Sequence, residues 1–143
     1  MNKTLVIGVG NTLRGDDGAG VRVAEKAGAQ FPDVDVLCVH GLTPELAETV
    51  ARYDRVIVVD ASLTAGGLRV TTLNPESPFP RSHSLSPGGV LALSSSLYHR
   101  APAEALLIEL PLRSAGFSES LSSGTAGLVD ACLDVMKPYV TGH

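Results

Sequence analysis

The chain has 143 residues, of which 44% are hydrophobic, and its 15 acidic residues outnumber its 11 Lys and Arg residues for a formal net charge of -4. This length fits one domain, residues 1–143, with a hydrophobic core of its own. No cluster of basic residues exists to bind nucleic acid, and no apolar run is long enough to cross a membrane. Since no signal-peptide pattern opens the sequence, we expect a cytoplasmic protein.

The first part of the sequence alternates between strand and helix patterns. Residues 3–9 are apolar enough for a strand buried on both faces, and residues 18–31 have helical spacing. A second strand is predicted over residues 34–40. A second helix is predicted over residues 44–53, with Thr43 as its cap.

The middle of the sequence predicts two more strands and a long loop. Residues 55–61 are continuously apolar as far as Asp60, and residues 68–74 alternate apolar and polar side chains. The alternating segment predicts a half-exposed strand at a sheet edge. Residues 74–88 contain four prolines, so we expect an irregular loop of a kind that is often functional.

The last part predicts a helix, a strand and a second helix. Ser86 and the proline after it are typical of a helix start, and this helix is expected to continue to Tyr98. Residues 105–111 form the fifth strand pattern. Residues 122–139 form an amphipathic helix that is expected to stop near Pro138. Strands that alternate with helices indicate an α/β fold with a mostly parallel sheet covered on both faces.

The two cysteines are isolated in the sequence. Cys38 lies in a strand pattern and Cys132 in a helix pattern, so neither belongs to a C-x-x-C pair. We expect both to be reduced residues of the core.

The glycine-rich stretch "GVGNTLRGDDGAG", residues 8–20, follows the first strand, where a nucleotide-binding loop would lie. Leu13 occupies the place of the third glycine of the dinucleotide fingerprint, and Asp16 and Asp17 would repel a phosphate. A phosphate-binding P-loop is excluded because no Lys-Ser or Lys-Thr pair follows the glycines. We therefore expect no tightly bound organic cofactor.

The acidic residues of this loop suit a different ligand. One of the two acids can cap the following helix, whereas the other is expected to face a crevice shared with Asp60. The carboxyl ends of parallel strands meet at one edge of a sheet, which brings the loop and Asp60 together. A buried acid such as Asp60 needs a helix N-terminus, an arginine or a metal as its partner.

Histidines supply candidates for a third ligand. His83 lies in the proline-rich loop ahead of a predicted helix, and His40 follows the second strand. His99 lies beside Arg100, which is a poor place to bind a cation. Two carboxylates and one imidazole suit a divalent transition metal with open coordination positions.

The stretches "GVGNTLRGDDGAGVRVAE", "VIVVDA" and "SHSLSP" resemble the hydrogenase maturation endopeptidases, which trim the C-terminal extension of the large subunit of [NiFe] hydrogenase. The resemblance runs from the first strand to the last helix. It implies a phosphorylase/hydrolase-like three-layer αβα sandwich with a five-stranded mixed sheet. The implied strand order is 2-1-3-5-4, with the fourth strand antiparallel.

The resemblance also implies a site and a partner. Asp17, Asp60 and His83 match the family's metal-recognition and catalytic residues, and the partner is the large-subunit precursor. With Asp17 in the site, Asp16 is the acid that we expect to cap the following helix. The metal is nickel that the precursor brings, so the endopeptidase recognises its substrate through the ion. The stretch "HGLTPEL" departs from a pattern that many members have after the second strand, so His40 stays a candidate for an additional site residue.

Two other functions are compatible with the same residues. The protein could recognise or hold nickel without cutting anything, because no unmistakable nucleophile or base is visible. It could also be a hydrolase with a tightly held zinc of its own. Metal content and cleavage of a precursor distinguish these alternatives.

Overall fold

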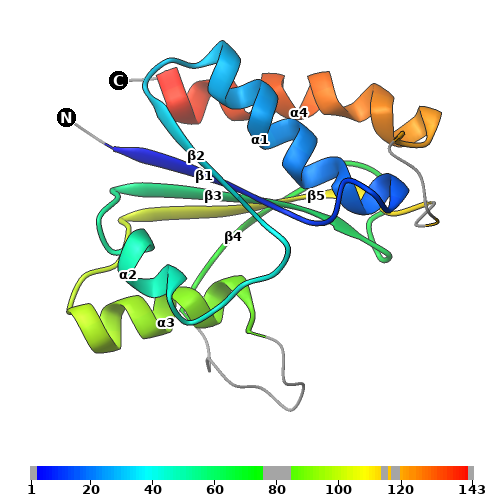
Figure 1. The fold of residues 1–143 in the computed structure, drawn as a ribbon. Helices are drawn as coiled ribbons and strands as arrows, with labels where there is room; N and C mark the ends of the chain where they lie inside the picture. Colours follow the sequence, from blue (N-terminus) through cyan, green and yellow to red (C-terminus); the bar gives the residue numbers. More distant parts are fainter. Residues whose placement is uncertain (1–2, 76–84, 114–115, 117–119, 142–143) are drawn as a thin grey trace.

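The computed structural model describes residues 3–75, 85–113, 116 and 120–141. Five strands alternate with helices along the chain, except that β4 follows β3 directly (Figure 1). The strands are β1 (Thr4–Val9), β2 (Val34–Val39), β3 (Arg55–Ser62), β4 (Arg69–Thr72) and β5 (Glu104–Pro111). The helices are the 3-10 turn η1 (Gly15–Gly18), α1 (Ala19–Gln30), α2 (Leu46–Val50), α3 (Pro87–Tyr98) and α4 (Ser123–Thr141).

The strands form one sheet in the order β2-β1-β3-β5-β4. All neighbours pair in parallel except β4, which runs antiparallel to β5. Helices α1 and α4 cover one face of the sheet, and α2 and α3 cover the other (Figure 1). The predicted three-layer α/β sandwich, its strand order and its antiparallel fourth strand are therefore confirmed.

Side chains of the central strands point alternately to the two faces of the sheet, so the hydrophobic core has two halves, one on each face. In β3, Ile57 and Val59 pack against α1 and α4, whereas Val56 and Val58 pack against α2 and α3. Successive side chains of a strand point to opposite faces, so Asp60 belongs to the face covered by α2 and α3. The register of the parallel strands places Glu109 of β5 beside Asp60 on this face.

Two predicted helices have different bounds in the structure. The α-helical part of the second helix is limited to Leu46–Val50, because bonds of the i to i+3 type bracket it, such as Leu46 N–H to the Thr43 carbonyl and Tyr53 N–H to the Val50 carbonyl. The last helix does not stop near Pro138 but continues to Thr141. A proline this near the end of a helix removes only one late backbone bond.

The edge strand β4 differs from the prediction in its exposure. All four of its residues are exposed, so its predicted edge position is confirmed but the expected alternation of buried and exposed residues is not.

The two cysteines differ in burial. Cys132 is buried as predicted, and burial raises its pKa to about 12. The prediction for Cys38 was wrong: it is exposed, because β2 is the other edge of the sheet.

The start of α3 confirms the predicted cap. The Ser86 side-chain oxygen accepts a hydrogen bond from the Gly89 N–H at 3.0 Å, and Pro87 occupies the first helical position. Most of the proline-rich segment before it, residues 76–84, lies outside the described residues.

Candidate active site at the carboxyl edge of the sheet

Two glycines bring the first loop against the carboxyl edge of the sheet. Gly10 has a φ of +143°, and a side chain there would collide with the Asp17 carbonyl oxygen. A side chain at Gly20, in the first turn of α1, would collide with the Val59 carbonyl oxygen. The loop, η1 and the start of α1 therefore pack directly against the end of β3, where Asp60 lies.

Asp17 is fixed by the loop that precedes it. The side chain is half-buried, and its Oδ2 accepts a hydrogen bond from the Asn11 N–H at 2.9 Å. The Asn11 Oδ1 in turn accepts a hydrogen bond from the Leu13 N–H at 2.9 Å, which closes the turn of the loop. One oxygen of Asp17 thus has a backbone donor that holds it in place.

Asp60 is half-buried at the end of β3. Burial raises its pKa to about 6, although its Oδ1 accepts a hydrogen bond from the Ala61 N–H at 2.8 Å. The negative charges of Asp17 and Glu109 contribute to the same rise in the pKa as smaller causes than burial. The structure thus brings Asp17 and Asp60 close enough to repel each other, and a cation would relieve that repulsion.

The predicted histidine ligands are not grouped with the two acids in the described part of the structure. His83 lies outside the described residues. His40 is exposed and borders a surface pocket of about 130 Å³ together with Gly10 and Thr12 of the first loop. Across residues 3–75, 85–113, 116 and 120–141, no three His, Cys, Asp or Glu side chains are grouped to hold a metal ion. The roles of Asp17, Asp60 and His83 stay predictions.

Glu109 is an acid beside the site that the sequence analysis did not select. It lies next to Asp60 across the β3–β5 pairing, and Arg69 lies opposite it on β4. Its Oε1 accepts a hydrogen bond from the Arg69 Nε at 2.9 Å and forms an ion pair with the Arg69 Nη2 at 2.8 Å. The Arg69 Nη2 also donates to the Thr64 hydroxyl at 3.0 Å. The only signal in the sequence was an acid near the end of an apolar strand, because its pairing with Asp60 is set by the register of the sheet.

Asp16 has a role that differs from the predicted one. Its carboxylate is fully buried and accepts hydrogen bonds from the Arg113 N–H at 2.8 Å, the Ser122 N–H at 2.7 Å, the Ser122 hydroxyl at 2.8 Å and the Thr125 hydroxyl at 3.1 Å. The expectation that it caps its own helix was wrong. Its hydrogen bonds to Ser122 and Thr125 link η1 to the start of α4, where the helix dipole also favours an acid.

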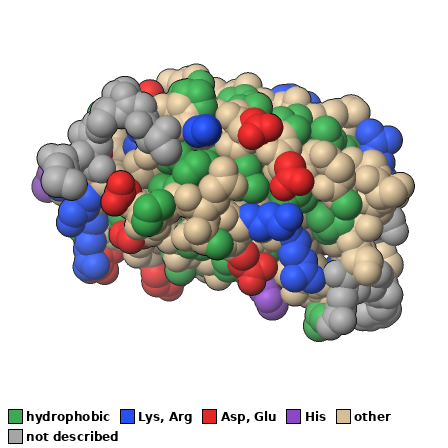
Figure 2. Space-filling view, turned by 90° about the horizontal axis from the view of Figure 1, so that it is seen from above, with side chains coloured by type: hydrophobic (Ala, Val, Ile, Leu, Met, Phe, Trp, Pro, Cys, Tyr) green, Lys and Arg blue, Asp and Glu red, His purple; other side chains and the backbone are tan. Residues whose placement is uncertain are grey.

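The charged side chains of one face and the character of the described helices bear on other kinds of partner. On the side viewed in Figure 2, Lys and Arg side chains lie among Asp and Glu side chains instead of forming one patch. None of the described helices combines the length and apolar character that crossing a membrane requires.

Comparisons with known proteins identify the fold. The chain is similar to the solved structure of the hydrogenase maturating endopeptidase HYBD from E. coli, with 21% identity, a TM-score of 0.78, and 98% of this chain and 93% of the other covered. It is also similar to a hydrogenase 2 maturation peptidase from a Thaumarchaeota archaeon, with 27% identity, a TM-score of 0.72 and 99% of both chains covered.

A third structure is the [NiFe] hydrogenase maturation protease HybD from Thermococcus kodakarensis, with 21% identity, a TM-score of 0.72, and 97% of this chain and 99% of the other covered. No protein-family model and no curated protein matches the sequence. The resemblance that the sequence indicated is confirmed in the fold: along nearly its whole length, this chain is built like the hydrogenase maturation endopeptidases.

Proposed function

We propose that this protein is an endopeptidase that removes the C-terminal extension of a nickel-loaded [NiFe] hydrogenase large-subunit precursor. The observation that carries the proposal is that Asp17 lies close enough to raise the pKa of Asp60, at the carboxyl edge of a fold shared with maturation endopeptidases. In α/β sheets this edge is where ligands bind. His83 is the third residue that we assign to the site, from the sequence resemblance.

The chemistry of the acids suits an ion that arrives with the substrate. Carboxylates and an imidazole are hard or borderline donors, and cysteine is not among the assigned residues. A nickel ion already held by substrate thiolates can use such donors to complete its coordination. The same donors would not retain the ion after the product leaves, so the site can turn over.

The electrostatics of Asp60 support this assignment. Burial and the neighbouring acids oppose its ionisation, which raises its pKa to about 6. A cation that binds between Asp17 and Asp60 would favour the charged form of both and remove that penalty. We therefore assign the recognition of the ion to these residues, and we assign the activation of water to no residue.

The test is cleavage of purified precursor prepared with and without nickel, followed by mass spectrometry of its C-terminus. We expect loss of the extension only from the nickel-loaded form, and no loss with Asp17→Asn, Asp60→Asn or His83→Ala. Asp54→Asn is the matched control, because Asp54 bonds to Lys3 and Arg100 away from the carboxyl edge. Nickel-dependent binding without a mass loss would instead indicate a binding protein, and tightly held zinc would indicate an ordinary metallohydrolase.

A further inference from the structure

The open edge of the sheet at β4 has the features of a peptide-docking site. Strand β4 is the last in the sheet order, and within the described part of the chain it pairs on one side only, with β5. Its four residues are all exposed. An unpaired edge of this kind offers backbone donors and acceptors to another extended chain.

The register shows which backbone groups face outward. The Leu73 N–H donates inward to the Ala105 carbonyl at 2.8 Å, and inward pairing alternates along an antiparallel strand. Thr71 and Arg69 therefore also face β5. The backbone N–H and C=O groups of Val70 and Thr72 face outward, away from the sheet.

The side chains of this edge do not protect it. Natural edge strands commonly carry lysine, proline or inward-pointing charges that prevent pairing with another chain. Here the only charged side chain is that of Arg69, and it is engaged with Glu109 and Thr64. Val70 presents an apolar side chain that is 40% exposed.

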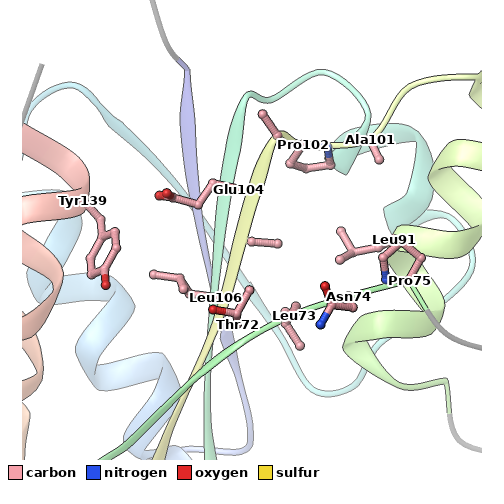
Figure 3. Close-up of a pocket in the computed structure, with 12 residues that line it drawn as sticks. Thr72, Leu73, Asn74, Pro75, Leu91, Ala101, Pro102, Glu104, Leu106 and Tyr139 are labelled. Atoms are coloured by element: carbon pink, nitrogen blue, oxygen red, sulfur yellow. The ribbon is translucent and has the colours of Figure 1, made fainter.

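Hollows adjoin the end of the edge strand. A cavity of about 490 Å³ is lined by Thr72 and Asn74 and reaches both Tyr139 of α4 and Leu91 of α3, so it extends to both faces of the sheet (Figure 3). A second cavity of about 330 Å³ lies between Thr71 and Pro87. Side chains of an added strand alternate between the two faces, and these hollows can receive them.

The edge is also placed within reach of the candidate site. Arg69, Glu109 and Asp60 lie in one row across β4, β5 and β3. A strand added outside β4 would lie three strand spacings from β3, which is roughly 14 Å. A segment of four or so extended residues spans the same distance, so a chain docked on β4 can present a nearby peptide bond at the Asp60 edge.

We propose that β4 binds an extended segment of the precursor next to the cleaved bond by strand addition, through the outward backbone groups of Val70 and Thr72. This inference rests on the proposed function. Backbone pairing accepts many side-chain sequences, which suits a protease whose selectivity lies in a metal ion. The edge would supply affinity for the extended chain, and the acidic site would supply discrimination.

The test uses Val70→Pro and Thr72→Pro, each of which removes one outward N–H and leaves the inward bonds to β5 in place. For nickel-loaded precursor we expect the double variant to raise KM about tenfold with kcat nearly unchanged. Val70→Thr keeps the N–H and is the matched control. Thermal unfolding of each variant verifies that it is folded, and either single proline variant can be used if the double variant is not.

The outcomes separate this inference from the proposed function. If the wild-type protein does not cut nickel-loaded precursor, the proposed function fails. If the wild type cuts and folded proline variants have an unchanged KM, docking at β4 is wrong while the function stands. If the proline changes convert a dimer into a monomer in light scattering without changing KM, the edge pairs with a second copy and the proposal is overturned.

Discussion

Asp16 and Asp17 are adjacent in the chain, but they direct their carboxylates to different partners. Asp16 is fully buried among donors from Arg113, Ser122 and Thr125, whereas Asp17 accepts one bond from Asn11 and lies near Asp60. The first acid links η1 to the last helix. The second acid is left available to the carboxyl edge of the sheet.

This difference predicts opposite consequences for the two asparagine variants. Asp16→Asn should lower the free energy of unfolding by about 2 to 4 kcal/mol, since a neutral amide turns one donor toward the donors that the carboxylate accepted. Asp17→Asn keeps an oxygen for the Asn11 N–H, so it should cost less than about 1 kcal/mol. Urea unfolding measures both values.

Cleavage of nickel-loaded precursor supplies the second half of this comparison. We expect Asp17→Asn to abolish cleavage while the protein stays folded, and Asp16→Asn to lower activity only as far as it lowers the folded population. Two stable variants that both cut like the wild type would contradict the assignment of Asp17.

Local and consistent signals in the sequence were sufficient for the fold class, whereas the strand order and the antiparallel fourth strand were implied by the family resemblance. Continuous apolar runs identified the central strands, and the alternating residues 68–74 identified the edge strand. The errors came from features that tertiary contacts decide. The length of α2, the continuation of α4 through Pro138 and the exposure of Cys38 all depend on what packs beside these residues.

The candidate site was predictable only in part, for a similar reason. Asp60 was visible as an acid that ends an apolar strand, and Asp17 as the surplus acid of the loop. Glu109 acquires its place through the register of β3 and β5, and Asp16 through partners about a hundred residues away. Such relationships are set by tertiary structure and leave little trace in local sequence.

The raised pKa of Asp60 predicts a pH-dependent stability difference. The pKa of Asp60 is about 6 in the folded protein, compared with the ordinary value of 3.8 that applies to the unfolded chain. Between these two pH values the folded state therefore binds a proton that the unfolded state has lost. Well below the ordinary pKa of 3.8 both states are protonated, and stability falls as the pH rises from there toward 6. Above pH 6 the wild type carries a penalty of at most about 3 kcal/mol, which Asp60→Asn avoids.

Thermal unfolding in the presence of a chelator measures this effect. Asp60→Asn should be more stable than the wild type at pH 7.5, and the difference should vanish well below the ordinary pKa of 3.8. Asp54→Asn should show no such gain, because the backbone bond from Lys3 and the charge of Arg100 lower the pKa of Asp54. An Asp60→Asn variant that is less stable than the wild type at pH 7.5 would refute this account of the site.

Glu109 should influence Asp60 through its charge. Glu109→Gln keeps an oxygen for Arg69 but removes the negative charge, so the pKa of Asp60 should fall below about 6. Burial is the largest cause of the shift, so the pKa should stay above its ordinary value. NMR titration of the Asp60 carboxyl group measures the change. Glu48→Gln, at a surface acid paired with Arg52, should leave it unaltered.

The proposed recognition through a substrate-borne ion predicts that the isolated protein binds nickel only weakly. Two carboxylates and one histidine, without a cysteine, form a weak site for nickel, whereas the thiolates of the precursor hold the ion firmly. Calorimetric titration of the purified protein with Ni²⁺ should therefore give an affinity far below that of the precursor. Metal analysis of the protein as purified should find no stoichiometric metal, and nickel-free precursor should stay intact. Stoichiometric zinc, or efficient cutting of nickel-free precursor, would favour a hydrolase that carries its own metal.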